Sequence, residues 1–108
     1  MQTFQLEQNY VFYDRDPFAQ PLYVDKMGRI LRFMLKPGQS VVEHTAPHSP
    51  VYIVVVSGTG RFSGGDGEAQ SYGPGSLLVF APGEPHAIHA QEEELVFVAF
   101  LHGAPGAQ

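Results

Sequence analysis

Two blocks of this sequence repeat one arrangement of turn residues and apolar residues. The first block is residues 37–60 (PGQSVVEHTAPHSPVYIVVVSGTG), and the second is residues 73–89 (GPGSLLVFAPGEPHAIH). In each block a glycine-containing turn precedes an apolar run, and histidines stand next to a second turn. Glycine and proline at such short intervals end strands rather than continue helices. We therefore expect two pairs of strands, each of which delivers histidines to a shared interior.

In the rest of the chain, too, turn residues separate short apolar runs. Twelve glycines and nine prolines separate short apolar runs, which is typical of an all-β sandwich or barrel. No segment combines a helix start signal with a 3.6-residue period. A chain of 108 residues is long enough to bury one core. We expect a single domain, residues 1–108, in which residues 28–101 form the barrel and residues 103–108 form a flexible tail.

Aromatic-rich segments at residues 10–13 and 21–24 predict two strands ahead of the barrel. These N-terminal strands, within residues 1–26, either cover the barrel or join the sheet of a neighbouring subunit. Residues 51–56 (VYIVVV) are apolar on both faces, which indicates a strand that is buried on both sides. In so small a chain this favours a subunit interface, and hence a homodimer. The side chains expected to point outward are Tyr52, Val54 and Val56.

Alternation within residues 28–36 separates a core face from a solvent face. The core face is wholly apolar: Leu31, Phe33 and Leu35. The opposite face carries Arg32 and Lys36, which we expect to point toward solvent.

The same period of two orders the next strand. It pairs Val42 with His44 on the inner face and leaves Val41 and Glu43 on the opposite face.

The two blocks resemble the paired motifs of the cupin superfamily. Gly38, His44 and Gly58 fit the spacing of the first motif, in which Ala46 occupies the place of the second histidine and Val51 the place of the glutamate. The second motif is matched by Gly75, Gly83 and His86, whereas Ala81 and Ala90 replace its first proline and its asparagine. The resemblance implies a double-stranded β-helix, a jelly-roll barrel, over roughly residues 28–101.

In cupins the histidines and the glutamate of these motifs bind a divalent metal, so the resemblance implies His44 and His86 as metal ligands. His48 follows His44 by four residues, in a bend that could fold it back over the barrel mouth. Three histidines and a water would form an open site of the kind that catalytic metals use. Neutral imidazole suits Zn, Ni, Fe or Mn. The alternative is that His44 and His86 are hydrogen-bonded pocket residues and His48 is a solvated loop residue.

Other polar residues near the motifs are less strongly indicated as site residues. His89 follows His86 by three residues, so on a strand it points to the opposite face. His102 stands beside the glycine-rich tail, where a surface role is expected. Glu84, in the turn before His86, either orients that histidine, acts as a base at the rim, or is an exposed turn residue. The sequence contains no recognisable nucleophile triad or phosphate-binding loop.

Two functions follow as hypotheses. The first is a metal-dependent enzyme, an oxygenase, isomerase or lyase acting on a small organic molecule, with one divalent ion on His44, His48 and His86. The second is a metal-independent or non-catalytic binding protein, in which an apolar pocket encloses a small molecule and histidines supply the few polar contacts. In both, the apolar lining is expected to be Phe33, Leu35, Ile53, Val55, Leu78, Phe80 and Phe97.

Composition argues against several other partners. The net charge is -5 with six Lys and Arg together, which is unlike a nucleic-acid surface. No apolar run approaches the roughly 20 residues that cross a bilayer, so no membrane partner is expected. The chain has no cysteine, and residues 1–14 have neither a basic start nor an apolar signal core. On these absences we expect a cytoplasmic protein.

Overall fold

The computed structural model describes residues 1–44 and 48–102, without the side chains of residues 42–44. The predicted tail at residues 103–108 lies outside the described residues. Within them, every regular element is a β-strand. The strands are β1 (Phe18–Val24), β2 (Gly28–Leu35), β3 (Ser40–His44), β4 (Val51–Ser57), β5 (Gly60–Ser63), β6 (Gln70–Tyr72), β7 (Leu77–Phe80), β8 (His86–Ala90) and β9 (Leu95–His102).

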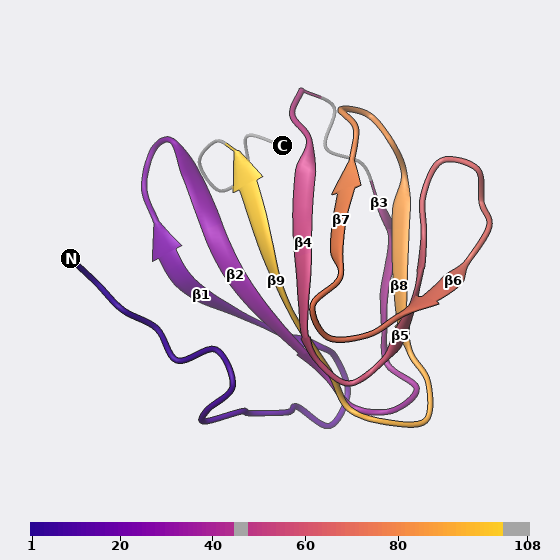
Figure 1. The fold of residues 1–108 in the computed structure, drawn as a ribbon, viewed down its shortest axis with the longest axis horizontal. Helices are drawn as coiled ribbons and strands as arrows, with labels where there is room; N and C mark the ends of the chain where they lie inside the picture. Colours follow the sequence, from indigo (N-terminus) through magenta and orange to yellow (C-terminus); the bar gives the residue numbers. More distant parts are fainter. Residues whose placement is uncertain (45–47, 103–108) are drawn as a thin grey trace.

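These strands form two sheets that face each other (Figure 1). The larger sheet has the order β1-β2-β9-β4-β7, and the smaller one has the order β3-β8-β5-β6. All strand pairs within them are antiparallel. Strands that are neighbours in a sheet are often distant in sequence, as for β2 and β9, which pair without interruption from Gly28↔His102 to Leu35↔Leu95. The predicted all-β fold is confirmed.

The core fills the space between the sheets. It takes alternate residues from each strand, as expected for side chains on a pleated surface. Leu35 and Leu95 are fully buried, and Phe97 stacks on Phe33 with ring centroids 4.9 Å apart. The buried core residues are Leu35, Val51, Ile53, Val55, Phe62, Phe80, Ile88, Ala90, Leu95, Phe97 and Ala99.

The outer face of β2 departs from the expectation. Arg32 does point away from the core, but only 4% of it is exposed, so the prediction of a solvent-facing residue is wrong. The N-terminal segment, residues 1–17, contacts it through main-chain carbonyl groups. The guanidinium donates to the carbonyl oxygens of Gln8 at 2.8 Å and Leu6 at 3.2 Å, and to Oε1 of Gln20 at 2.8 Å. Lys36, also on this face, is half-buried and pairs with Asp14.

Residues 10–13 do not form the predicted strand. Their backbone groups bond to side chains instead of to a neighbouring strand: the amide of Val11 donates to Sδ of Met34 at 3.3 Å, and the carbonyl of Tyr13 accepts from Nε2 of Gln39 at 2.8 Å. The aromatic pattern therefore marks an extended covering segment, whereas the second aromatic segment does belong to a strand, β1.

Val41 was expected on the face opposite to the core, and this is wrong. It is partly buried and packs against the core. The pairing of β3 with β8 shifts register between Val41 and His44, and such an irregularity changes which side chains share a face.

The alternation in β4 is as predicted. Val51, Ile53 and Val55 are buried, whereas Tyr52 and Val54 are half-buried on the outer face. In the part of the chain that the structure describes, no helix is long and apolar enough to cross a membrane.

Candidate functional site

A small cavity lies between the sheets at the end of the core where β4 and β8 begin. Its volume is about 40 Å³. Strands of both sheets line it, and among the side chains that the structure describes, His86 is the single titratable residue in that lining. A cavity with one buried imidazole among apolar walls can enclose an apolar group and form a hydrogen bond at one point.

His86 is held rigidly at the cavity wall. It is the first residue of β8 and is only 3% exposed. Its ring stacks on Phe80, with the centroids 4.7 Å apart and the planes at 27°. Nδ1 lies 3.3 Å from the carbonyl oxygen of Glu84, two residues earlier. Because a carbonyl can only accept, this contact places a proton on Nδ1.

Glu84 shapes the turn that precedes His86. Its carboxylate accepts from the amide of Gly65 at 2.8 Å and from the amide of Ala81 at 2.9 Å. The Gly65 amide first, and the Ala81 amide next, hold the pKa of Glu84 below its ordinary value. The carboxylate therefore ties the turn to the β5–β6 hairpin, and the contact with His86 comes from the backbone carbonyl of Glu84.

Of the three predicted metal ligands, the structure describes the side chains of His86, at the cavity wall, and of His48. The loop residue His48 is exposed and does not line the cavity. The backbone of His44 lies on β3, where its Cα atom pairs with that of His86. The side chain of His44 lies outside the described part of the chain.

The other two histidines lie outside the cavity. His89 is exposed on the outer face of the smaller sheet, where its Nδ1 is 2.6 Å from Oγ of Ser40. His102 is exposed at the end of β9, with its ring edge-on to Tyr52 at 5.8 Å. Their positions agree with the expectation of an opposite face and of a surface role.

Three of the predicted apolar pocket residues line the cavity: Phe33, Ile53 and Phe97. The other four lie elsewhere in or against the core, because they occupy different levels of the same inner faces: Leu35, Val55, Leu78 and Phe80.

Five of the lining residues were not predicted to line the pocket. Ile88 and Ala99 share an inner face with His86 and Phe97, two residues away, so the period of two could have found them. Val51 and Leu101 sit opposite each other on β4 and β9, a pairing that no local signal predicts. Val41 was missed because of the register irregularity in β3.

Comparison with known protein families identifies the family to which the chain belongs. The family described as "Cupin domain" matches residues 31–101. The chain belongs to the cupin family. The matched region runs from β2 to β9 and so includes every strand that lines the cavity.

Solved structures show the same fold. A double-stranded β-helix protein from Klebsiella pneumoniae is 19% identical, with a TM-score of 0.86 over 100% of this chain and 94% of that one. An RmlC-like cupin from Desulfovibrio desulfuricans is 24% identical, with a TM-score of 0.82 over 94% and 96%. A Thermotoga maritima protein described as a predicted oxalate decarboxylase is 25% identical, with a TM-score of 0.67 over 72% and 68%. None of the curated proteins matches the sequence.

The donor set of this cupin does not fit the metal site that the family resemblance implies. Where that resemblance places a glutamate ligand, Val51 is 3% exposed and lines the cavity. A valine offers no lone pair to a metal ion. Within the described residues, no three His, Asp or Glu side chains lie close enough together to hold an ion.

Proposed function

We propose that this cupin binds a small organic molecule in the cavity beside His86 without the help of a metal ion. The observation that carries the proposal is the composition of the cavity wall as far as its side chains are described: His86 is its one titratable residue, and Val51 stands at the place of the family's glutamate. Ligand pockets are typically apolar, with few polar groups that fix orientation. His86 is the group that would do so here.

The size of the cavity limits the ligand. A buried water needs roughly 10–15 Å³ of such volume, so about 40 Å³ holds three or four groups of that size. A ligand that fits without rearrangement therefore has three or four non-hydrogen atoms, with an apolar body and one hydrogen-bonding group. The binding free energy of very small ligands reaches at most about -1.5 kcal/mol per non-hydrogen atom. Four such atoms therefore give a dissociation constant no tighter than roughly 40 µM.

The test uses 2-propanol as the probe and the imidazole nitrogen NMR signals as the readout. We expect a saturable shift of the His86 signals in the millimolar range and no saturable shift of His89, which is exposed on the opposite surface. Equal, linear drift of both signals would show that the alcohol acts only as a solvent.

A cavity-filling variant provides the control. Ala99 is 3% exposed and lines the cavity, so Ala99→Val adds two carbons to the wall and should abolish the His86 response. The backbone amide spectrum reports whether this variant is folded. A folded Ala99→Val protein that binds 2-propanol as well as the parent does would place the ligand elsewhere.

A second candidate is the metal-dependent enzyme. The observation in its favour is the pairing of the Cα atoms of His44 and His86 on neighbouring strands. Two imidazoles fall short of the three protein ligands of an open catalytic zinc site. Metal uptake therefore separates the two functions.

A further inference from the structure

The two sheets of the sandwich leave an open groove along one side. β7 is an edge strand of the larger sheet, β6 is an edge strand of the smaller one, and a groove of about 410 Å³ lies between them. It is lined by every residue of β7 and, from β6, by Gln70 and Tyr72. These two residues pair with the buried Phe62 and Gly60 on β5, so they belong to the inner face of their sheet. Gln70 is nevertheless exposed and Tyr72 is half-buried, because the described part of the larger sheet ends at β7.

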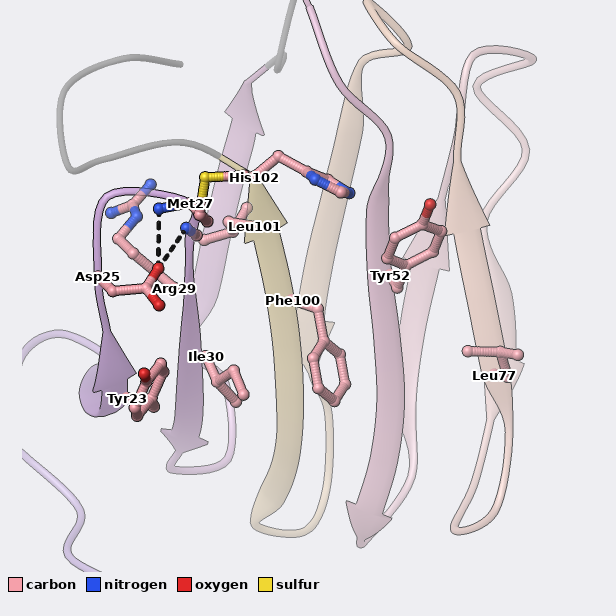
Figure 2. A pocket seen from close by; sticks show the side chains of 11 residues that line it. Tyr23, Asp25, Met27, Arg29, Ile30, Tyr52, Leu77, Phe100, Leu101 and His102 are labelled. Carbon is pink, nitrogen blue, oxygen red and sulfur yellow. Dashed lines mark hydrogen bonds between the residues drawn. The ribbon is translucent and has the colours of Figure 1, made fainter. Parts of the chain in front are cut away.

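The backbone of β7 has a free edge beside this groove. The carbonyl oxygen of Ser76, just before the strand, accepts from the amide of Val55 on β4 at 3.0 Å. In an antiparallel pair, residues that bond to the neighbouring strand alternate with residues whose N–H and C=O groups face the other side. Counting from Ser76, every second residue bonds to β4, whereas Leu77 and Val79 direct their backbone groups to the free edge. Figure 2 shows Leu77 on β7, beyond Tyr52 on β4.

β7 lacks two features that commonly protect an edge strand. Edge strands in soluble proteins often carry a charged residue or a proline, which prevents another chain from pairing with them. The four residues of β7, LLVF, include neither. Backbone polar groups next to apolar surface are normally paired. β7 therefore offers two N–H and two C=O groups to a further strand.

The charge of the groove limits the kind of strand that fits. Asp66, Glu68 and Glu84 line it, and no lysine or arginine is among the lining residues that the structure describes. The Glu84 carboxylate accepts from the amides of Gly65 and Ala81, which places the acidic end of the groove at the C-terminal end of β7. Asp66 and Glu68 are exposed there. Their charge favours a basic partner.

We propose that an extended basic segment of another protein binds in this groove as a sixth strand of the larger sheet. Its main chain pairs with Leu77 and Val79. Its inward side chains are apolar and cover Tyr72, and lysines or arginines at its end meet Asp66 and Glu68. Strand addition of this kind draws affinity from main-chain hydrogen bonds and specificity from the contacts of alternate side chains.

A short peptide with this pattern tests the proposal: KKVTVTVKK, acetylated and amidated so that its ends are uncharged. Fluorescence anisotropy of the labelled peptide should show saturable binding, and glutamates in place of the lysines should abolish it. Two N-methylated forms separate strand addition from simple charge attraction. Because alternate N–H groups of a strand face opposite edges, methylating either the valines or the threonines blocks one edge only. One of these two forms should lose binding, and the other should retain it.

Proline at position 79 removes an N–H group from the free edge of the protein itself. Val79→Pro should weaken peptide binding about tenfold without breaking a hydrogen bond to β4. Val79→Ala keeps the N–H group, so it is the matched control and should bind as the parent does. The backbone amide spectrum reports whether each variant is folded. If Val79→Pro is unfolded, the methylated peptides decide.

A second pair of variants tests the charge of the groove. Asp66→Asn combined with Glu68→Gln should weaken binding about threefold or more, since it removes two partners of the lysines. Glu92→Gln combined with Glu93→Gln, at exposed positions in the turn before β9, changes the net charge equally and should leave binding unchanged.

Several results would overturn the proposal. These are a lysine peptide that does not bind up to about 1 mM, equal binding by the two methylated forms, equal binding by the lysine and glutamate peptides, and equal binding by the parent and a folded Val79→Pro. Sedimentation equilibrium examines another occupant. A mass that falls toward 11.8 kDa in Val79→Pro but not in Val79→Ala would assign this edge to a second copy of the chain instead.

Discussion

At the scale of single residues, Arg32 shows how a charged side chain can serve as a structural anchor. Arg32 is almost fully buried and its acceptors are neutral: the main-chain carbonyls of Gln5, Leu6, Gln8 and Asn9 and the side-chain oxygen of Gln20. Tyr10 lies against it, with Cζ 5.5 Å from the ring centre. A planar group with five donors suits such a cluster of carbonyls better than the single ammonium of lysine.

We therefore expect Arg32→Met to lower the free energy of unfolding by about 2–4 kcal/mol, since it removes several hydrogen bonds to a charged donor. Urea denaturation measures the loss. Trypsin cleavage after Arg15 should also accelerate, because the N-terminal segment is released. The matched control is Arg61→Met, at a half-buried arginine with one hydrogen bond, to the carbonyl of Ala69. Equal effects of the two substitutions would contradict the anchoring role.

Glu84 makes stability depend on pH. Its pKa is lowered, first by the Gly65 amide and next by the Ala81 amide. The native state therefore binds fewer protons than the unfolded state. This stabilisation is present above the ordinary glutamate pKa of about 4.3 and is lost as the pH falls through the lowered value.

Glu84→Gln should accordingly lower the melting temperature more at pH 7 than at pH 3. Glu93→Gln, at an exposed position, should change little at either pH. If the difference in melting temperature between the parent and Glu84→Gln stayed constant with pH, the ionised carboxylate would not be the group that stabilises the turn.

At the scale of elements, the turn between β4 and β5 depends on one glycine. Gly58 has a φ of +75°, and a Cβ atom placed there would lie 1.9 Å from the carbonyl oxygen of Glu94. This residue also fits the closing glycine of the first cupin motif. Both the left-handed backbone and the close approach of another chain segment require a residue without a side chain.

We expect Gly58→Ala to cost more than about 2 kcal/mol in unfolding free energy, because the backbone of one segment must move. Gly67 provides the comparison: its φ is +73°, but nothing lies within 4 Å of an added Cβ. Gly67→Ala should therefore cost only about 1 kcal/mol. Chemical denaturation of both variants measures the difference, and equal costs would contradict the steric explanation.

Element positions were predictable where local signals are strong. Glycine and proline turns and the period of two locate most strands, and they place Val51, Ile53 and Val55 inward on β4. Residues 10–13 were misassigned because aromatic, β-branched composition fits any half-buried extended segment, whether or not it pairs. Val41 was misplaced because a register irregularity leaves no local trace in the sequence.

At the scale of the whole molecule, the two faces of the larger sheet have different surroundings. Inward side chains of β4 and β9, such as Ile53 and Phe97, line the cavity. The residues between them on the same strands, such as Tyr52 and Phe100, lie on the outer face of the sheet, where 37% of Phe100 is exposed. The alternation of side chains on a strand thus places the cavity lining and the outer surface on opposite faces of one sheet.

The site was predictable in part. Motif spacing singled out His86, and this histidine is buried beside apolar residues at the cavity. The size of the cavity and the proximity of Val51 to it depend on how two sheets pack, which spacing alone does not give. His48, which follows His44 by four residues, is exposed and is not among the residues that line the cavity, and its role as a ligand stays a prediction.

Metal uptake tests the central claim, that His86 serves this cavity without a metal ion, most directly. Untagged protein is incubated with Zn²⁺, Ni²⁺, Fe²⁺ or Mn²⁺, dialysed, and analysed by plasma mass spectrometry, with His86→Ala as the control. The account predicts well under one equivalent of any ion, and no difference between the parent and His86→Ala. About one equivalent per chain that disappears in His86→Ala would contradict it and establish the metal-dependent alternative.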